Sequence, residues 1–233
     1  MSVATVICAT EDDIPELAAL LACTLSAGAL GAWLVPDAGV RDRALRSYAE
    51  FVLMQAVQHG RVDTTEDRAA VAVWFSRLEF PAAGGGWTYE LRRVLGPMAA
   101  RIAVLHAVAP HTPHHYLAQI ANRPGQGAAA KAVLEHCHQA VDAEGLPAYA
   151  QVCSSEPRES LLGQLGYVPR SPVLLGSGGP VLWRMWRRLP TSEQDRLLPR
   201  RTRLHRAAPC SGDLISVDRN FASTRGQKLP ATG

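Results

Sequence analysis

The segment 115–134, HYLAQIANRPGQGAAAKAVL, constrains the fold of this chain more than any other segment does. Residues 116–121 form a mostly apolar run of strand length, and the sequence PGQG at 124–127 then breaks that run. A helical pattern follows, in which apolar residues recur at every fourth position from Ala129 to Val141. The segment therefore predicts a strand, a tight turn and a helix in direct succession.

The predicted turn is suited to binding an anion. A glycine turn that opens a helix leaves several backbone N–H groups without acceptors, and these groups are directed at one point. The helix dipole adds partial positive charge at the same point, which favours a phosphate group. The turn is therefore a candidate phosphate site, although the strand–turn–helix units of many α/β proteins have the same pattern.

The composition fits one domain of ordinary size with an extension. The chain has 233 residues, and 47% of them are hydrophobic, which is enough for a core. Apolar runs are short, and residues 1–13 lack a secretion-signal pattern, so we expect a cytoplasmic protein without a membrane partner. Five scattered cysteines fit a reducing compartment. We expect no metal, because no CxxC pair exists and the histidines of His136-Cys137-His138 diverge on a helix.

The net charge of +3 is unevenly distributed along the chain. Residues 1–186 contain 14 Lys and Arg against 17 Asp and Glu, whereas residues 187–233 contain 10 against 4. The basic character belongs to the C-terminal end, so the body gives no reason to expect a nucleic-acid partner. We expect one domain over residues 1–188 and a basic, mostly disordered tail over residues 189–233.

Further strands and helices are predicted along the domain. Thr10 and Asp13 have the spacing of a capping box, which starts a helix after the first strand. The uninterrupted apolar run 69–75 predicts a buried strand. The other expected elements are strands at 3–9, 61–65 and 147–153, helices at 40–59 and 157–164, a loop at 26–36 and a closing hairpin at 173–186.

These motifs together resemble the GNAT superfamily of N-acetyltransferases. The family pattern is roughly YLxxLAVxPxxQGxGxG before a helix, and it is matched here by Tyr116-Leu117, Ile120-Ala121-Asn122, Pro124 and Gln126-Gly127. Two departures are a turn one residue short and the presence of Ala129 and Lys131 where glycines are usual. The AAVAVW strand at 69–74 and the run at 96–117 resemble puromycin N-acetyltransferase-like proteins of actinobacteria.

The resemblance implies a mixed α/β fold whose central, mostly antiparallel sheet has six or seven strands flanked by helices. The sheet would be split near its fourth and fifth strands. A bulge in the fourth strand, expected here at 120–122, would direct a backbone N–H at the thioester carbonyl. The implied co-substrate is acetyl-CoA, with binding residues Ile120, Ala121, Asn122, Gln126, Gly127, Ala128, Ala129, Ala130 and Lys131.

The same resemblance identifies candidate residues for acceptor binding and proton transfer. The acceptor candidates are Trp33, Tyr48, Trp74 and Glu79, although each also fits an ordinary packing or loop role. The tyrosine that usually protonates the leaving thiolate is replaced by Leu162, and Gln151 stands where related enzymes carry a glutamate. Tyr116 and Ser154 are therefore the candidate catalytic residues.

The leading hypothesis is a cytoplasmic N-acetyltransferase, acting as a monomer or homodimer. It would move an acetyl group from acetyl-CoA to a primary amine of a small molecule of the antibiotic or secondary-metabolite type. The alternative is a degenerate GNAT-fold protein that binds an acyl-CoA, or only a partner, without catalysis. The missing tyrosine and the alanines in the turn favour that alternative, and acetylation of protein amines stays open as a third hypothesis.

Overall fold

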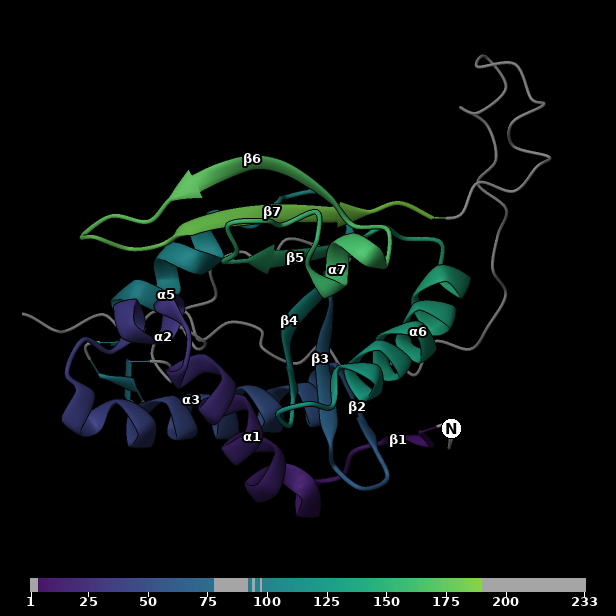
Figure 1. Ribbon diagram of the computed structural model, residues 1–233, viewed down its shortest axis with the longest axis horizontal. Coiled ribbons are helices and arrows are strands. Elements are labelled where there is room, and N and C mark those ends of the chain that lie inside the picture. Colours follow the sequence, from purple (N-terminus) through teal and green to yellow (C-terminus); the bar gives the residue numbers. More distant parts are fainter. Residues whose placement is uncertain (1–3, 78–91, 94, 97, 190–233) are drawn as a thin grey trace, which may run out of the picture. The chain divides into compact units, whose positions relative to one another are not determined.

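The computed structural model describes residues 4–77, 92–93, 95–96 and 98–189 (Figure 1). Helices and a single sheet account for most of these residues. In chain order the elements are β1 (Val6–Cys8), η1 (Glu11–Asp13), α1 (Ile14–Ser26), α2 (Ala29–Leu34), α3 (Ala38–His59), β2 (Arg61–Thr65), β3 (Ala70–Arg77), α5 (Met98–Ala107), β4 (His114–Asn122), α6 (Gly127–Ala143), β5 (Ala148–Val152), α7 (Leu161–Gln164), β6 (Val168–Leu174) and β7 (Val181–Arg187).

The sheet has seven strands in the order β1-β2-β3-β4-β5-β7-β6. Every neighbouring pair is antiparallel except β4 and β5, which run parallel. The predicted mixed α/β fold, with a mostly antiparallel sheet flanked by helices, is therefore confirmed. The strand–turn–helix unit over 115–134 is also present, as β4 and the start of α6.

Helix α6 covers one face of the sheet, which we call the α6 face. The four-residue spacing places Val133 and Cys137 on the buried side of the helix, and both are fully buried. They pack against the sheet together with small residues such as Ala70, Ala72 and Ala148. Because alanine adds little volume, it allows the helix to approach the strands closely.

Helices α1 and α3 cover the opposite face, which we call the α1–α3 face. Leu17 of α1 and Leu53 of α3 are fully buried beside Val71 and Val73 of β3. Alternate residues of β3 thus face the two helix layers, as expected for a strand buried on both sides. The chain enters α1 through the predicted capping interaction, since the Thr10 N–H donates to the Asp13 carboxylate at 2.8 Å.

Two expectations need correction and two cannot be compared with the structure. The segment 26–36 is not a loop throughout, because Ala29–Leu34 forms α2. The closing hairpin is longer than predicted, since β6 already begins at Val168. The expected acceptor residue Glu79 and residues 190–233 of the expected tail lie outside the described residues. Within the described part of the chain, no helix combines the length and apolarity needed to cross a bilayer.

Because α6 packs closely against the sheet, a cavity between them should lower the free energy of unfolding. Leu134 is fully buried in the α6 face, so Leu134→Ala should lower the free energy of unfolding by about 2–5 kcal/mol. Met54 of α3 is 47% exposed, and Met54→Ala should change the same quantity by less than about 0.5 kcal/mol. Urea unfolding followed by circular dichroism measures both values. Equal effects of the two substitutions would contradict this assignment of the core.

Candidate functional site

The sheet opens between β4 and β5. The parallel pairing of these strands covers only three residue pairs, from His115–Ala148 to Leu117–Ala150. Beyond Leu117, β4 continues for five residues, and the four of them that pair do so with β3 alone among the described strands. Figure 1 shows the two strands running in clearly different directions. One edge of the C-terminal half of β4 is therefore available for hydrogen bonds to something other than the sheet.

A β-bulge lies at the point where the opening begins. Val73 of β3 pairs with Gln119 and Trp74 pairs with Leu117, so Ala118 is an extra residue on β4. The expectation of a bulge at 120–122 is wrong, because those three residues pair regularly with residues 70–72 of β3. The bulge instead lies directly after the last β5 partner of β4.

The turn from Arg123 to Ala128, which we call the amide turn, presents free backbone donors. The Arg123 N–H donates to Ala69 O at 2.8 Å, and the Gln126 N–H donates to Arg123 O at 3.0 Å. Among the described residues, no acceptor is found for the N–H groups of Gly125, Gly127 and Ala128. They stand at the N-terminus of α6, where the helix dipole also favours an anion.

Glycine keeps the approach to these donors open. Gly125 has a φ of +79°, a left-handed conformation that other residues adopt only with strain. A Cβ atom added at Gly125 or Gly127 would meet no heavy atom within 4 Å, so it would project into open space in front of the turn. The space that a side chain would fill is thus left for a ligand. The amide turn fits the diphosphate of a coenzyme A molecule in both donors and access.

Two exposed cations stand beside the amide turn. Arg123 pairs with Glu16 at 2.8 Å, and Lys131 lies 3.8 Å from Glu135. All four side chains are about half exposed, and such surface ion pairs contribute only about 0–1 kcal/mol. Either cation can therefore turn from its carboxylate to a bound phosphate at small cost.

The predicted cofactor residues divide into two groups. Ala129 and Ala130 donate their N–H groups to Gln126 O at 3.0 and 3.4 Å, and their side chains lie in the α6-face core. These two residues shape the helix start and offer no free donor. The other predicted residues lie on β4, in the amide turn and farther along α6. They are Ile120, Ala121 and Asn122 on β4, Gln126, Gly127 and Ala128 in the amide turn, and Lys131 on α6.

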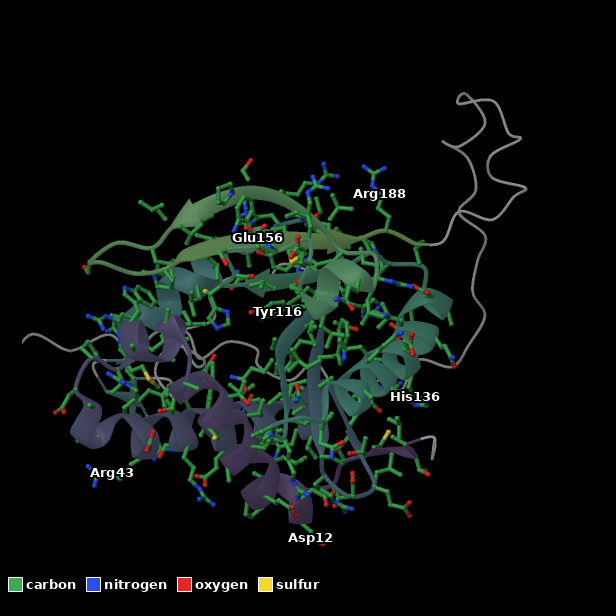
Figure 2. The ribbon with its side chains drawn as sticks, viewed as in Figure 1. Asp12, Arg43, Tyr116, His136, Glu156 and Arg188 are labelled. Carbon is green, nitrogen blue, oxygen red and sulfur yellow. The ribbon has the colours of Figure 1, made fainter. Side chains whose placement is uncertain are left out.

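An aromatic cluster lies on the α1–α3 face near the bulge. Figure 2 marks Tyr116 close to the place where β4 meets β5. Its ring centroid is 5.8 Å from that of Tyr149, and Tyr149 lies 5.3 Å from His114 and 5.0 Å from Trp186. Burial raises the pKa of Tyr116 well above its usual value of 10.0, so its hydroxyl stays protonated at neutral pH. It can donate a hydrogen bond there but is a weak acid.

Tyr48 and Gln119 complete this wall of the site. Burial raises the pKa of Tyr48, while the adjacent Gln119 side chain lowers it. The Oε1 atom of Gln119 is buried, and no donor among the described residues meets it with hydrogen-bond geometry. A buried acceptor without a partner costs free energy, so this oxygen is prepared for a donor on a ligand.

The other predicted substrate and catalytic residues do not join this wall. Trp33 is 7% exposed, and its Nε1 donates to Gly176 O at 2.8 Å, which ties α2 to the turn before β7. Trp74 points to the α6 face, where its ring lies 6.0 Å from that of His138. Ser154 follows β5, and its Oγ accepts from the Glu156 N–H at 3.1 Å. Of the predicted substrate and catalytic residues that the structure describes, Tyr48 and Tyr116 come together.

Leu162 and Gln151 stand at the two positions where related enzymes carry acid–base groups, and the structure shows what each side chain contacts instead. Leu162 is 5% exposed and packs in the α6-face core, so it offers no hydroxyl. Gln151 donates to Leu105 O and to the Tyr149 hydroxyl, both at 3.1 Å. Gln151 therefore orients Tyr149, a residue that sequence reasoning missed. Alternation along β5 could have placed Tyr149 and Gln151 on the same face.

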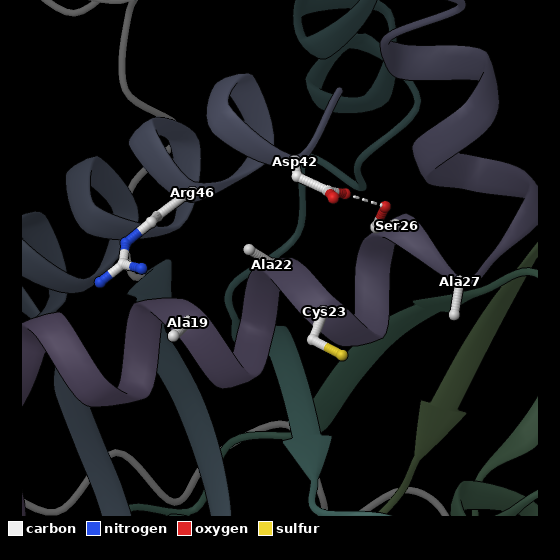
Figure 3. A pocket seen from close by; sticks show the side chains of 7 residues that line it. All are labelled: Ala19, Ala22, Cys23, Ser26, Ala27, Asp42 and Arg46. Carbon is white, nitrogen blue, oxygen red and sulfur yellow. Dashed lines mark hydrogen bonds between the residues drawn. The ribbon is translucent and has the colours of Figure 1, made fainter. Parts of the chain in front are cut away.

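Two surface hollows lie away from the amide turn. One, of about 450 Å³, is shown in Figure 3 and is lined by Ala19, Ala22, Cys23, Ser26, Ala27, Asp42 and Arg46. Its polar contact is a hydrogen bond of 2.5 Å from Ser26 Oγ to Asp42. The other, of about 290 Å³, is lined by Pro147, Arg170, Trp186 and Arg188. None of the predicted site residues lines either hollow.

The His-Cys-His run of α6 does not gather around one point. His136 is exposed (Figure 2), Cys137 donates to Asp63 at 3.1 Å, and His138 shares a 3.0 Å hydrogen bond with the Tyr167 hydroxyl. Over the residues that the structure describes, no group of three or more His, Cys, Asp or Glu side chains is placed to hold a metal.

Comparisons with known proteins show the fold. Scans of protein-family models and of curated proteins find no match. Among solved structures, the histone acetyltransferase HPA2 and related acetyltransferase from Corynebacterium glutamicum matches with a TM-score of 0.63 and 22% identity, over 82% of this chain and 99% of that one. An N-acetyltransferase from Staphylococcus aureus matches with a TM-score of 0.53 and 13% identity, over 78% and 100% of the two chains.

A third match is the polyamine N-acetyltransferase of Drosophila melanogaster, with a TM-score of 0.53 and 16% identity over 79% of this chain and 100% of that one. At these identities the likeness establishes that the chain has the GNAT acetyltransferase fold. The activity has to be argued from the residues of the site.

Buried His138 predicts a pH-dependent stability. Burial and the nearby Arg187 lower its pKa from 6.5 to about 4, so the fold requires the neutral ring. The unfolded chain takes up this proton near pH 6.5, so the stability is complete above that pH and falls as the pH drops to 4. At about 1.4 kcal/mol per pKa unit, the loss approaches 3 kcal/mol.

Unfolding free energies measured between pH 7 and pH 4 test this expectation. His138→Gln should flatten the decline, whereas substitution of the exposed neighbour in His136→Gln should leave its slope unchanged. An unchanged slope in the His138 variant would contradict the assignment.

Proposed function

We propose that this protein is an N-acetyltransferase that moves the acetyl group of acetyl-CoA to a primary amine of a small molecule. The observation that carries the proposal is the position of the amide turn at the end of the free edge of β4. Free donors of Gly125, Gly127 and Ala128 lie at one end of this edge, and the bulge at Ala118 lies at the other. Together they offer a continuous row of backbone groups for a long, polar acyl carrier.

The chain's own residues would supply binding and polarisation. The amide turn and Lys131 would hold the diphosphate, and the edge of β4 would pair with the amide-containing arm. Bound acetyl-CoA supplies the activated acyl group. A backbone N–H at the bulge would stabilise the negative charge that develops on the carbonyl oxygen as the amine nitrogen attacks. Holding the two reactants together contributes much of the remaining acceleration.

Proton transfer is the step for which the chain offers fewest groups. The attacking nitrogen must lose a proton, and the departing thiolate must gain one. Tyr116 and Ser154 are the proposed proton carriers, either directly or through water. Tyr116 is the stronger candidate because it lies beside the opening of the sheet, whereas the Ser154 hydroxyl is already hydrogen-bonded to a backbone N–H.

The acceptor is proposed to be of the antibiotic or secondary-metabolite type. This part rests on the resemblance of segments 69–74 and 96–117 to puromycin N-acetyltransferase-like proteins. The proposal places the enzyme in the cytoplasm, as a monomer or homodimer, with the domain over residues 1–188 as the catalytic part.

A second candidate function is binding of an acyl-CoA without catalysis. Leu162 occupies the position of the usual proton-donating tyrosine, and burial raises the pKa of the nearest substitute, Tyr116. Two measurements separate the candidates. Release of free CoA thiol with a panel of amines supports the enzyme. Protection of the protein against heating by CoA, without turnover, supports the binding protein.

Gly125→Ala tests the amide turn. The Cβ atom would be placed on a residue with a φ of +79°, so the turn should shift and the CoA affinity should fall by about tenfold, the equivalent of about 1.4 kcal/mol. Calorimetric titration with CoA measures this change.

Gly145→Ala is the matched control. Gly145 has a φ of +74° and equally open surroundings, but it lies at the other end of α6. This variant should lose similar stability and keep its CoA affinity. Unchanged CoA binding in Gly125→Ala would count against the amide turn as the phosphate site.

Tyr116→Phe tests the proposed proton carrier. Because a phenol with a raised pKa transfers its proton weakly, the variant should lose about tenfold in kcat, less than the 10²-fold or more expected of a well-matched acid. The KM for acetyl-CoA should stay unchanged. Ser154→Ala should lower kcat by less than about twofold, since its hydroxyl accepts a local hydrogen bond. A larger effect of Ser154→Ala would reverse the two roles.

A further inference from the structure

Arg77 places a positive charge on the wall that contains Tyr116. It is the last residue of β3, and alternation along the strand directs it to the α1–α3 face with Val73 and Phe75. Its guanidinium carbon lies 5.9 Å from the centre of the Phe75 ring and 5.7 Å from the centre of the Tyr116 ring. These are cation–π distances, so the head group is folded back over the strand toward the site.

The Arg77 guanidinium is not neutralised by a carboxylate of the described residues. It is half-buried, and burial lowers its pKa, which shows that its surroundings disfavour the charge. Acidic residues of the neighbouring elements are engaged elsewhere, since Asp63 of β2 pairs with Arg61 and Glu50 of α3 pairs with Arg46. An incompletely solvated charge without a counter-ion costs free energy, and an anionic ligand would recover it.

Two nearby histidines add no positive charge to this site. Burial lowers the pKa of His106 to about 4 and also lowers that of His114, and the charge of Arg77 lowers both further. Both rings are therefore neutral at physiological pH. Arg77 is the fixed positive charge that acts on Tyr116, and Arg184 of β7 acts on Tyr149. No carboxylate of the described residues is paired with Arg77.

Gln119 provides a hydrogen-bond acceptor near the bulge. Its Oε1 atom is a buried acceptor without a donor among the described residues. In the register of the sheet, Val73 lies opposite Gln119 and Phe75 lies opposite Tyr116. Arg77 itself lies opposite His114, four residues or roughly 13 Å along β3 from Val73, and its guanidinium is folded back over Phe75. The acceptor and the cation therefore act on the same face, with the Phe75–Tyr116 pair between them.

We propose that the acceptor is a molecule that carries both a primary amine and a carboxylate, with the body of the molecule between the two groups. Arg77 would bind the carboxylate and Gln119 would accept from the amine. The aromatic rings of Tyr48 and Tyr116 would pack against the body between them. The inference rests on the proposed function and narrows its substrate class. It disfavours polyamines, because a second cation would lie beside Arg77.

A matched set of acceptors tests the proposal on the full chain with acetyl-CoA. The set is 4-(aminomethyl)benzoate, the neutral 4-(aminomethyl)benzamide and the dication 4-(aminomethyl)benzylamine. Because a hydrogen bond to a charged group is stronger than one between neutral groups, kcat/KM should be at least about tenfold higher for the benzoate than for the other two. Arg77→Gln should remove this preference mainly through KM, and Arg77→Lys should retain part of it.

Arg101→Gln is the control for loss of a cation–π contact alone. The Arg101 guanidinium lies 5.5 Å from the centre of the Trp33 ring, and it donates to Trp33 O. This variant should lose stability and keep the preference for the benzoate. Urea unfolding of each variant separates misfolding from a change in specificity.

A binding measurement separates failure of this inference from failure of the proposed function. Calorimetry with the CoA-loaded protein should show that 4-methylbenzoate binds at least about tenfold more tightly than 4-methylbenzamide, and that Arg77→Gln removes the difference. That result supports the anion site even if no amine is acetylated. Equal binding of the two probes, or acetylation of the dication in preference to the benzoate, would overturn the inference and leave the acetyltransferase proposal standing.

Discussion

The parallel hydrogen bonding between β4 and β5 ends at Leu117 and Ala150, and the candidate site depends on this short pairing. Helix α6 connects the two strands and also packs on β3 and β4. The extra residue Ala118 increases the twist of β4 at the point of separation. On the side toward β5, the backbone groups beyond it therefore stay unpaired with any described strand. A ligand that pairs with them adds hydrogen bonds that the fold itself does not make.

The two faces of the sheet carry different kinds of side chain. On the α6 face, alanines of the strands and apolar residues of α6 form a closely packed cluster, which fixes the start of α6 and hence the amide turn. The α1–α3 face carries apolar contacts beneath β2 and β3, but hydroxyl, amide and guanidinium groups collect toward β4 and β5. Most of these groups are engaged, while Gln119 Oε1 and the Arg77 guanidinium have unmet capacity. Packing on one face thus supports recognition on the other.

Sequence patterns predicted the order of elements because burial follows periodicity. The four-residue spacing from Ala129 to Val141 matches the buried side of α6, and the apolar run 69–75 matches β3. The pattern could not locate the bulge, since alternation in HHYLAQIAN does not reveal which residue lacks a partner. Small residues at 26–36 indicated a loop, yet tertiary contacts of Trp33 accompany a short helix there. Arg77 was missed because a charged residue at a strand end is usually solvent-exposed.

The replacement of the usual tyrosine by Leu162 should slow catalysis less than protonation of the acceptor amine does. Release of a thiolate with a pKa near 8.5 at pH 7 costs only about 2 kcal/mol without an acid, whereas neutralising an amine with a pKa near 10.4 costs roughly 5 kcal/mol. A nearby fixed cation lowers the pKa of a bound amine and so reduces the larger cost. On the proposed function, a carboxylate held by Arg77 would offset this effect, so the cation would favour the neutral nucleophile only for acceptors without a carboxylate. Since the described residues of the site include no strong base, turnover depends on how the amine loses its proton.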